Sequence, residues 1–374
     1  MGGAAGLRVV WACGASGAGK SVAAWGLFEE LAAAGERVAY VDIDQLGMLY
    51  PLPDGDPGWH HAVKGEALAR LVPGYVAAGA GLLIVSGVVD PLAGPRTPPG
   101  TDLTLCLLAP DPAGLRTRIL ARGWGEAAAD EAVAEDALLR AALFVDVRID
   151  TAALSVAETV ARLRAVAHVG DPQERHVEST SPASVRVVVV TGPRAVGSST
   201  VGFGVARGRW RAGRRTGFLD LQQLGFVSAA GRTGSESALA VGQLAAMHGF
   251  LAGRGAELLV VSGHLSIADR PLVRAALPRA EVTIVRLRAD ERTLVEHVRA
   301  RVGGSDARLA TDDLVGADPA HQAAVVAAAL AEQHLLDTSP TDDTVLDVTD
   351  QAPAETIAAV EHLSSWAGGA APSR

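Results

Sequence analysis

Short apolar runs alternate with longer amphipathic stretches along the whole chain. The runs have the length and the Val, Leu and Ile content of buried strands, and the stretches between them have the period of helices. Strands separated by helices need crossover connections, which predict parallel sheets covered by helices on both faces. In the first half of this α/β fold we expect strands at 7–12, 37–42, 81–86, 103–108 and 145–150, and helices at 19–34, 60–78, 111–122, 130–141 and 155–167.

The second half of the chain repeats the motifs of the first half in the same order. Gly14 aligns with Gly192 and Asp42 aligns with Asp220, and both pairs are 178 residues apart (192 − 14 and 220 − 42). A period of this length is too long for a solenoid and indicates two tandem globular domains. We expect domains over 1–168 and 184–366, a polar linker over 169–183 and a frayed tail over 367–374.

Composition narrows the class of protein. Of the 374 residues, 49% are hydrophobic and only 4% are aromatic, which predicts a sizeable core built from Ala, Val and Leu. A net charge of −9 argues against nucleic acid as the main partner, because phosphate neutralisation needs clustered Lys and Arg. No apolar run approaches the roughly 18 residues that span a bilayer, and the first residues have no signal-peptide pattern. We expect a cytoplasmic protein without a membrane partner.

The segment GASGAGKS, residues 14–21, has the spacing of a phosphate-binding loop, with a predicted strand before it and a predicted helix after it. Its glycines allow backbone N–H groups to approach phosphate oxygens, and the start of the helix adds a positive field. Lys20 would place a charge on the terminal phosphates of ATP, and the Ser21 hydroxyl can bind Mg²⁺. The expected ATP-binding residues are Gly14, Ala15, Ser16, Gly17, Ala18, Gly19, Lys20 and Ser21.

Two carboxylates, Asp42 and Asp44, end the second predicted strand, at the edge of the sheet where ligands bind. Beside Mg-ATP, one carboxylate could bind the water shell of the metal, and the other could accept a proton from an attacking hydroxyl. The alternative is that one of them only caps the following helix. On the helix beyond, His60 and Lys64 are one turn apart and would line the wall of an acceptor pocket, unless they lie at the surface.

The motifs GASGAGKS and YVDIDQLG, followed by DPAGLRTRILARG and VRIDTAALSVAETV, resemble the small-molecule kinases of the P-loop superfamily. The likeness is nearest to adenylylsulfate kinase, chloramphenicol phosphotransferase and the shikimate and gluconate kinases. It implies that Asp44 binds the acceptor hydroxyl and acts as base, and that Asp42 lies nearer the metal. It also implies that Arg118 and Arg122, at the start of a lid over 123–140, close on the transferring phosphate. A solvated basic helix face is the alternative for the arginines.

The second half lacks the expected chemistry at each aligned position. Ser198 replaces Lys20, Gln222 replaces Asp44 and His297 replaces Arg118. A lysine about 4 Å from a phosphate charge is worth about 4 kcal/mol at an effective dielectric near 20, whereas a neutral hydrogen bond contributes about 1 kcal/mol. The second domain is therefore expected to be a pseudo-kinase. Its first helix contains Gly202, Gly204 and Gly208, which predict a poorly formed helix.

The leading hypothesis is an ATP- and Mg²⁺-dependent phosphotransferase that phosphorylates a hydroxyl of a small molecule. A nucleotide-binding regulatory protein and a nucleoside or nucleotide kinase are the alternatives. The sequence leaves open the acceptor, the choice between ATP and GTP, and whether the two domains meet within one chain or across a homodimer.

Overall fold

The computed structural model describes residues 6–53, 59–170, 183–228, 237–303 and 312–366. Of the expected linker, only residues 169, 170 and 183 are among these residues, and the expected tail lies outside them. We call residues 6–170 the first lobe and residues 183–366 the second lobe. Within the described parts of both lobes, no helix has the length and apolar content needed to cross a bilayer.

The first lobe is built on a five-stranded parallel sheet with the strand order β2-β4-β1-β5-β6. The strands of this sheet are β1 (Leu7–Cys13), β2 (Val38–Asp42), β4 (Leu82–Ser86), β5 (Thr101–Ala109) and β6 (Val147–Asp150). The lobe also contains strand β3 (Leu49–Tyr50), which lies outside this sheet. Its helices are α1 (Lys20–Ala33), the 3-10 helix η1 (Ile43–Gln45), α2 (Trp59–Ala77), α3 (Pro112–Ala121), α4 (Gly125–Ala141) and α5 (Val156–Val166).

The second lobe has a six-stranded sheet with the order β11-β10-β7-β9-β8-β3, in which five strands are parallel and β3 of the first lobe is antiparallel. Its strands are β7 (Arg186–Thr191), β8 (Thr216–Asp220), β9 (Leu258–Ser262), β10 (Val282–Arg288) and β11 (Thr344–Asp347). Its helices are α6 (Ser198–Arg211), η2 (Leu221–Leu224), α7 (Ser237–Gly253), α8 (Asp269–Ala276), α9 (Glu291–Val302), α10 (Pro319–Thr338) and α11 (Pro353–Trp366).

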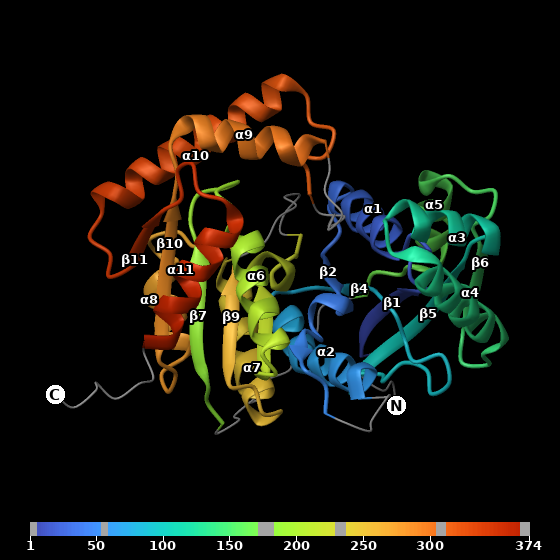
Figure 1. Cartoon of the computed structure of the whole chain (residues 1–374). Coiled ribbons are helices and arrows are strands. Elements are labelled where there is room, and N and C mark those ends of the chain that lie inside the picture. Colours follow the sequence, from blue (N-terminus) through green and yellow to red (C-terminus); the bar gives the residue numbers. More distant parts are fainter. Residues whose placement is uncertain (1–5, 54–58, 171–182, 229–236, 304–311, 367–374) are drawn as a thin grey trace.

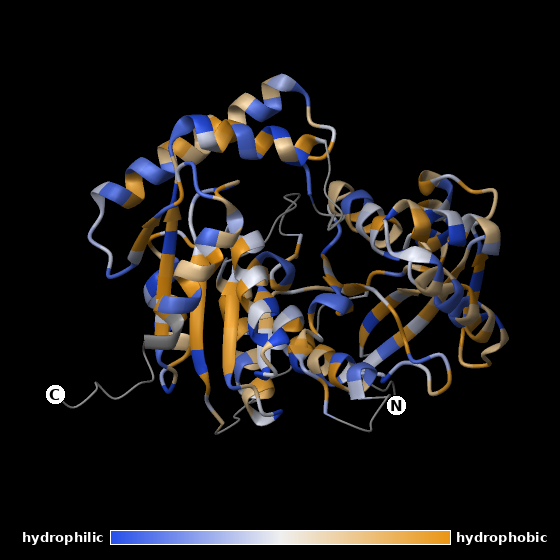
Figure 2. Ribbon diagram, viewed as in Figure 1, coloured by the Kyte–Doolittle hydropathy of each residue, from blue (hydrophilic) through white to orange (hydrophobic). Residues whose placement is uncertain are grey.

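Helices cover both faces of each sheet, as Figure 1 shows, which confirms the predicted α/β fold. Strand β1 is apolar on both sides: Val9 and Trp11 face a core cluster shared with α2, and Val10 and Ala12 face a second cluster with α1 and α5. In the second lobe, the central strands β7 and β9 are likewise hydrophobic along most of their length in Figure 2. Such continuous apolar runs are expected of parallel strands that are buried on both faces.

The predicted helix and strand positions in the first lobe agree with the structure to within a few residues, with two differences. Helix α4 begins at Gly125 instead of 130, and the two-residue strand β3 was not predicted. The helices α1 and α6 end before Gly35 and Gly213, whose φ angles are +82° and +71°, as left-handed caps require.

The prediction of a poorly formed first helix in the second lobe is wrong. Helix α6 is continuous over 14 residues, the same length as α1. A Cβ atom on Gly204 would overlap Ile357, and one on Gly208 would overlap Glu361, both on α11. The glycines therefore allow α11 to pack closely on α6, and this packing outweighs their low helix propensity.

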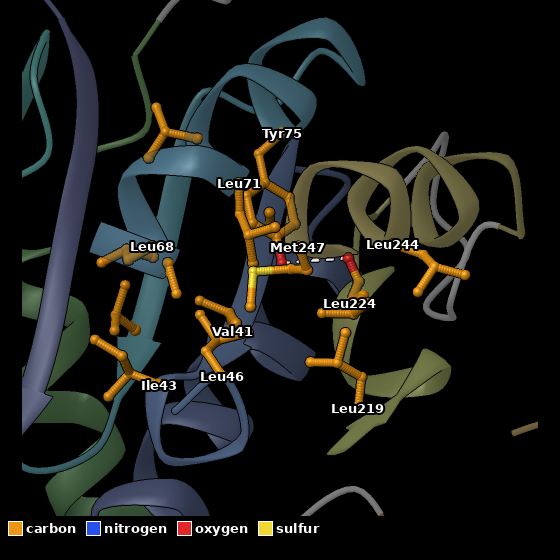
Figure 3. Close-up of a cluster of buried hydrophobic side chains, with 14 of the residues drawn as sticks. Val41, Ile43, Leu46, Leu68, Leu71, Tyr75, Leu219, Leu224, Leu244 and Met247 are labelled. Atoms are coloured by element: carbon orange, nitrogen blue, oxygen red, sulfur yellow. Dashed lines mark hydrogen bonds between the residues drawn. The ribbon is translucent and has the colours of Figure 1, made fainter. Parts of the chain in front are cut away.

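The two lobes share one hydrophobic core within the single chain. Helices α2 and α7 lie side by side at the centre of the molecule (Figure 1). Figure 3 shows the apolar side chains between them, among which the Tyr75 hydroxyl donates a hydrogen bond of 3.3 Å to the Leu224 carbonyl oxygen. Residues from both lobes belong to this one buried cluster, including Val41, Leu46, Leu71, Leu219, Leu244 and Met247.

The lobes also exchange short strand pairings across this contact. Residues 48–50 of the first lobe pair antiparallel with the edge strand β8, and residues 226–228 of the second lobe pair with the edge strand β2. Each partner in one pairing lies 178 residues from its counterpart in the other (226 − 48), so the contact has the reciprocity of a twofold interface. The N–H groups of Phe218, Tyr40 and Ser228 donate hydrogen bonds to the carbonyl oxygens of Met48 (2.9 Å), Phe226 (3.0 Å) and Val38 (2.8 Å), respectively.

Candidate functional site

The phosphate-binding loop connects the end of β1 to the start of α1. Gly14, Gly17 and Gly19 have φ angles of +149°, +84° and +91°, a backbone region that side chains other than glycine rarely adopt. A Cβ atom on Gly14 would also lie 2.7 Å from the Leu108 carbonyl oxygen. The loop therefore depends on these glycines, and its residues 14–19 lead into the N-terminus of a 14-residue helix.

Lys20 is buried at the first position of α1, with only 7% of its surface exposed. Its Nζ donates a hydrogen bond of 2.9 Å to the Ala15 carbonyl oxygen, so the side chain folds back over the loop. Burial lowers the Lys20 pKa, and the carboxylates of Asp44 and Glu135 oppose this shift. The ammonium group thus lies at the loop with acidic groups around it.

Ser21 and Asp42 are joined directly. The Ser21 hydroxyl donates a hydrogen bond of 2.7 Å to Asp42 Oδ2, and Asp42 Oδ1 accepts one of 2.9 Å from the Asp44 N–H. Burial raises the pKa of Asp42, and the neighbouring charge of Asp44 raises it further. Hydroxyl and carboxylate oxygens are the ligands that Mg²⁺ prefers. Among the residues that the structure describes, no group of three or more His, Cys, Asp or Glu side chains could hold a metal by itself.

Asp44 forms an ion pair with Lys64 of α2. The Asp44 Oδ1 and Lys64 Nζ atoms are 2.5 Å apart, and the two side chains are 35% and 4% exposed. Burial alone would raise the Asp44 pKa, but the adjacent Lys64 and Lys20 charges together hold it below its ordinary value. Asp44 is therefore ionised, and the charges of both lysines stabilise its carboxylate.

His60 lies one turn before Lys64 on the same face of α2. Its Nε2 is 3.0 Å from the Tyr50 hydroxyl oxygen. Burial, followed by the Lys64 charge, lowers the His60 pKa to about 4, so the ring is neutral at pH 7. The structure thus brings His60 and Lys64 together beside Asp44, whereas the neighbouring Trp59 ring lies under the Arg215 guanidinium, 5.4 Å away.

The arginines of α3 are not equivalent. Arg118 Nη1 donates a hydrogen bond of 3.5 Å to the Gly17 carbonyl oxygen of the loop. The Arg122 guanidinium lies over the Trp124 ring, 5.5 Å from its centroid. Arg116 pairs with acidic residues of α4. Of these three side chains, the structure places only Arg118 against the phosphate loop.

Glu135 on α4 was not predicted to belong to the site. Its Oε2 is 3.4 Å from the Ser16 N–H, which donates to it. Burial raises the Glu135 pKa, and the Lys20 charge opposes this shift. A carboxylate therefore lies against the backbone donors of the phosphate loop. The sequence carries no signal for this role, because α4 contains several acidic residues at similar spacing.

The second lobe keeps the frame of this site and the carboxylate that aligns with Asp42, but it lacks counterparts of the charged side chains of Lys20, Asp44 and Lys64. Ser199 donates to Asp220 Oδ2 at 2.7 Å, the same distance as the Ser21–Asp42 bond. His297 Nδ1 is 3.1 Å from the carbonyl oxygen of Ala195, which aligns with Gly17, so it takes the contact that Arg118 makes in the first lobe. The positions that align with Lys20 and Asp44 are Ser198 and Gln222 (20 + 178 and 44 + 178). Lys64 aligns with Ala240, because α2 and α7 end at Ala77 and Gly253, which are 176 residues apart (253 − 77).

Several solved structures are similar to part of the chain. A sugar kinase from Janibacter sp. HTCC2649 is 18% identical, with a TM-score of 0.31 over 49% of this chain and 94% of its own. A gluconokinase from Sinorhizobium meliloti 1021 is 19% identical, with a TM-score of 0.31 over 50% and 98%. The Mycobacterium tuberculosis APS kinase, solved with AMPPNP and APS, is 18% identical, with a TM-score of 0.31 over 49% and 99%.

No protein-family model matches the chain, and no curated protein matches it. Each of the three solved structures described above matches about half of the length of this chain.

Proposed function

We propose that this chain is an ATP-dependent phosphotransferase that phosphorylates a hydroxyl group of a small molecule. In this proposal the first lobe is catalytic and the second lobe is not. The observation that carries it is the convergence of Lys20, the Ser21–Asp42 pair and the Lys64–Asp44 pair at one edge of the first sheet. Three of these five side chains have no equivalent in the second lobe, where the same frame is present.

The nucleotide would bind along residues 14–21. Backbone N–H groups of the loop and Lys20 would contact the phosphates, and Arg118, already at the loop, would face the transferred group. Ser21 and Asp42 are the residues that fit Mg²⁺, which when bound would neutralise phosphate charge. These contacts stabilise charge, which is the main requirement of phosphoryl transfer.

The acceptor would bind against Asp44, at the carboxyl end of β2 beyond the phosphate loop. An acceptor hydroxyl that hydrogen-bonds to the ionised Asp44 carboxylate can transfer its proton to that carboxylate as its oxygen bonds to the γ-phosphorus of ATP. The bond from the γ-phosphorus to the bridging oxygen breaks, and ADP leaves with the electron pair of that bond. Lys64 would remain beside Asp44 and keep this carboxylate ionised and oriented. His60 and Lys64 would line the acceptor side.

A second candidate function is nucleotide binding without transfer to an acceptor. Two contacts favour it. Asp44 already forms an ion pair with Lys64, and the Glu135 carboxylate lies against the phosphate loop. A protein of this kind would report nucleotide occupancy to its second lobe. It would bind Mg-ATP without acceptor-dependent turnover.

The test is ADP release from Mg-ATP in the presence of hydroxylated metabolites, antibiotics, nucleosides and nucleoside monophosphates. The variants Lys20→Ala and Asp44→Asn are measured beside the wild type. Asp90→Asn serves as the matched control, because Asp90 is a carboxylate that accepts turn hydrogen bonds from Leu92 and Ala93 outside the loop.

The proposal expects one acceptor to raise the rate strongly, both site variants to abolish the increase, and Asp90→Asn to retain it. A response only to nucleosides or nucleotides would identify a nucleoside or nucleotide kinase. If Mg-ATP binds but no acceptor changes the rate, and Asp44→Asn behaves as wild type, the second candidate function replaces the first.

A further inference from the structure

The acceptor side of the candidate site is built on segments that the second lobe contacts. Helix α2, which carries His60 and Lys64, packs most extensively against α7 of the second lobe. Strand β3, which precedes it, pairs with β8 of the second lobe through Leu49 and Tyr50. The phosphate loop, in contrast, lies between β1 and α1 within the first lobe.

Tyr50 connects the second lobe to the acceptor side. Its ring lies 5.0 Å from the Trp210 ring in an edge-on contact, and its hydroxyl is 3.0 Å from His60 Nε2. Trp210 is itself oriented by a hydrogen bond of 2.7 Å from its Nε1 to the Thr216 carbonyl oxygen on β8. One side chain of the first lobe is therefore fixed by two features of the second.

His60 and Lys64 are packed tightly enough to transmit this position to Asp44. A Cβ atom on Gly47 would lie 2.6 Å from Lys64 Cγ and 3.2 Å from His60 Nε2, so both side chains lie directly on this glycine. Lys64 then forms the 2.5 Å ion pair with Asp44. Close-packed contacts of this kind have little room to rearrange independently.

The equivalent junction is the pairing of residues 226–228 with β2, and it does not contact the acceptor side of the candidate site. The residue that aligns with Tyr50 is Ser228 (50 + 178), whose hydroxyl contacts the main chain of Glu36 and Val38. Phe226 beside it packs on Trp25 and Tyr40. The two junctions therefore have the same backbone pairing but different side-chain contacts: Tyr50 contacts His60, whereas the Ser228 hydroxyl contacts main-chain atoms of β2 and of the residue Glu36 before it.

We infer that the second lobe serves as a fixed scaffold for the acceptor side of the first lobe, and that Tyr50 and Trp210 are the positioning residues through which it acts on His60, Lys64 and Asp44. This inference rests on the proposed function for its chemistry. It assigns the second lobe a role that needs neither nucleotide nor turnover.

The test is the titration of the His60 imidazole by NMR in the full chain, with His60→Gln to identify its signals among the ten histidines. The charged and titratable groups that face it are Lys64, His61, Asp44 and Tyr50. The variants are Trp210→Ala and Tyr50→Phe. Phe226→Ala is the matched control, because it removes a second-lobe ring from the opposite junction.

We expect His60 to titrate near 4 in the wild type and in Phe226→Ala. In Trp210→Ala we expect the His60 pKa to rise by about one unit or more, because more water then reaches the imidazole ring. Tyr50→Phe should raise it by a smaller amount, and this single-atom change decides the question if Trp210→Ala does not fold. Mg-ATP affinity, measured by calorimetry, should stay within about twofold in all three variants.

The inference is overturned if His60 titrates as in the wild type in folded Trp210→Ala and Tyr50→Phe, or if Phe226→Ala shifts it equally. The proposed function fails separately, through the absence of acceptor-dependent ADP release. In that case the His60 titration still decides whether the second lobe positions these groups.

Discussion

At the scale of single residues, the ion pair between Asp44 and Lys64 is the contact on which the acceptor side depends. Lys64 is only 4% exposed, so its charge is stabilised mainly by the Asp44 carboxylate. Removing one member of a buried pair leaves the other charge without a partner, which costs more than the pair itself contributes.

Asp44→Ala should therefore lower the free energy of unfolding by about 3 kcal/mol. Asp44→Asn should lower it less, because the amide oxygen still accepts a bond from Lys64. Chemical denaturation measures both values. Asp90→Ala is the control and should cost about 1 kcal/mol through its lost turn hydrogen bonds. Equal losses in Asp44→Ala and Asp90→Ala would show that Lys64 does not need this partner.

His60 should make the stability of the fold depend on pH. The His60 pKa is about 4 in the folded chain, whereas the ordinary value of 6.5 applies to the unfolded chain. As the pH falls, the unfolded chain therefore binds the proton before the folded chain does. Stability is then fully present above pH 6.5 and is lost between pH 6.5 and about 4. Thermal unfolding across this range should be less pH-dependent in His60→Gln, and His168→Gln, an exposed position, should behave as wild type.

At the scale of elements, helix α4 places Glu135 against the donors of the phosphate loop. A carboxylate at this place repels nucleotide phosphates. Glu135→Gln should therefore tighten Mg-ATP binding by about threefold, which corresponds to roughly 0.7 kcal/mol. Calorimetric titration measures the change. Glu131→Gln, an exposed acid one turn earlier on α4, should leave the affinity unchanged, and an equal effect of both variants would indicate only the loss of overall charge.

Substitution by alanine should have different effects on the stability of the fold at Gly204 of α6 and at Gly242 of α7. Gly204→Ala adds a Cβ that overlaps Ile357, so we expect a loss of about 1–3 kcal/mol. A Cβ on Gly242 has no neighbour within 4 Å, so Gly242→Ala should be neutral or should stabilise the fold by up to about 1 kcal/mol through helix propensity. Denaturation midpoints decide between the two signs, and a stabilised Gly204→Ala would contradict close packing of α6 on α11.

The predicted elements agree with the structure where a local pattern determines them. The runs that became β1 and β4 are continuous apolar stretches that could only be buried strands, and Gly35 marks the end of α1 without any tertiary information. Strand β3 has two residues, and its partner β8 lies in the other lobe, so no local signal exists for it. The pairing of Lys64 with Asp44 and the position of Glu135 were not predicted either, because each depends on a contact between separate elements of the first lobe.

At the scale of the whole molecule, the structure places both lobes around one core, and the second lobe carries the same loop frame with Ser198 in place of Lys20. We therefore propose that the first lobe binds nucleotide and that the second lobe acts as a scaffold. Lys20 is at the start of α1 in the first lobe and Ser199 is at the start of α6 in the second lobe, so one change in each lobe tests which of them binds the nucleotide.

The most direct measurement is the stoichiometry of Mg-ATP binding to the full chain by calorimetry, in the wild type, Lys20→Ala and Ser199→Ala. We expect about one site per chain in the wild type and in Ser199→Ala. We expect strongly weakened binding in Lys20→Ala, since the lysine would be the main charge on the phosphates. Two sites in the wild type, or a single site that Ser199→Ala removes and Lys20→Ala retains, would contradict the assignment of the lobes.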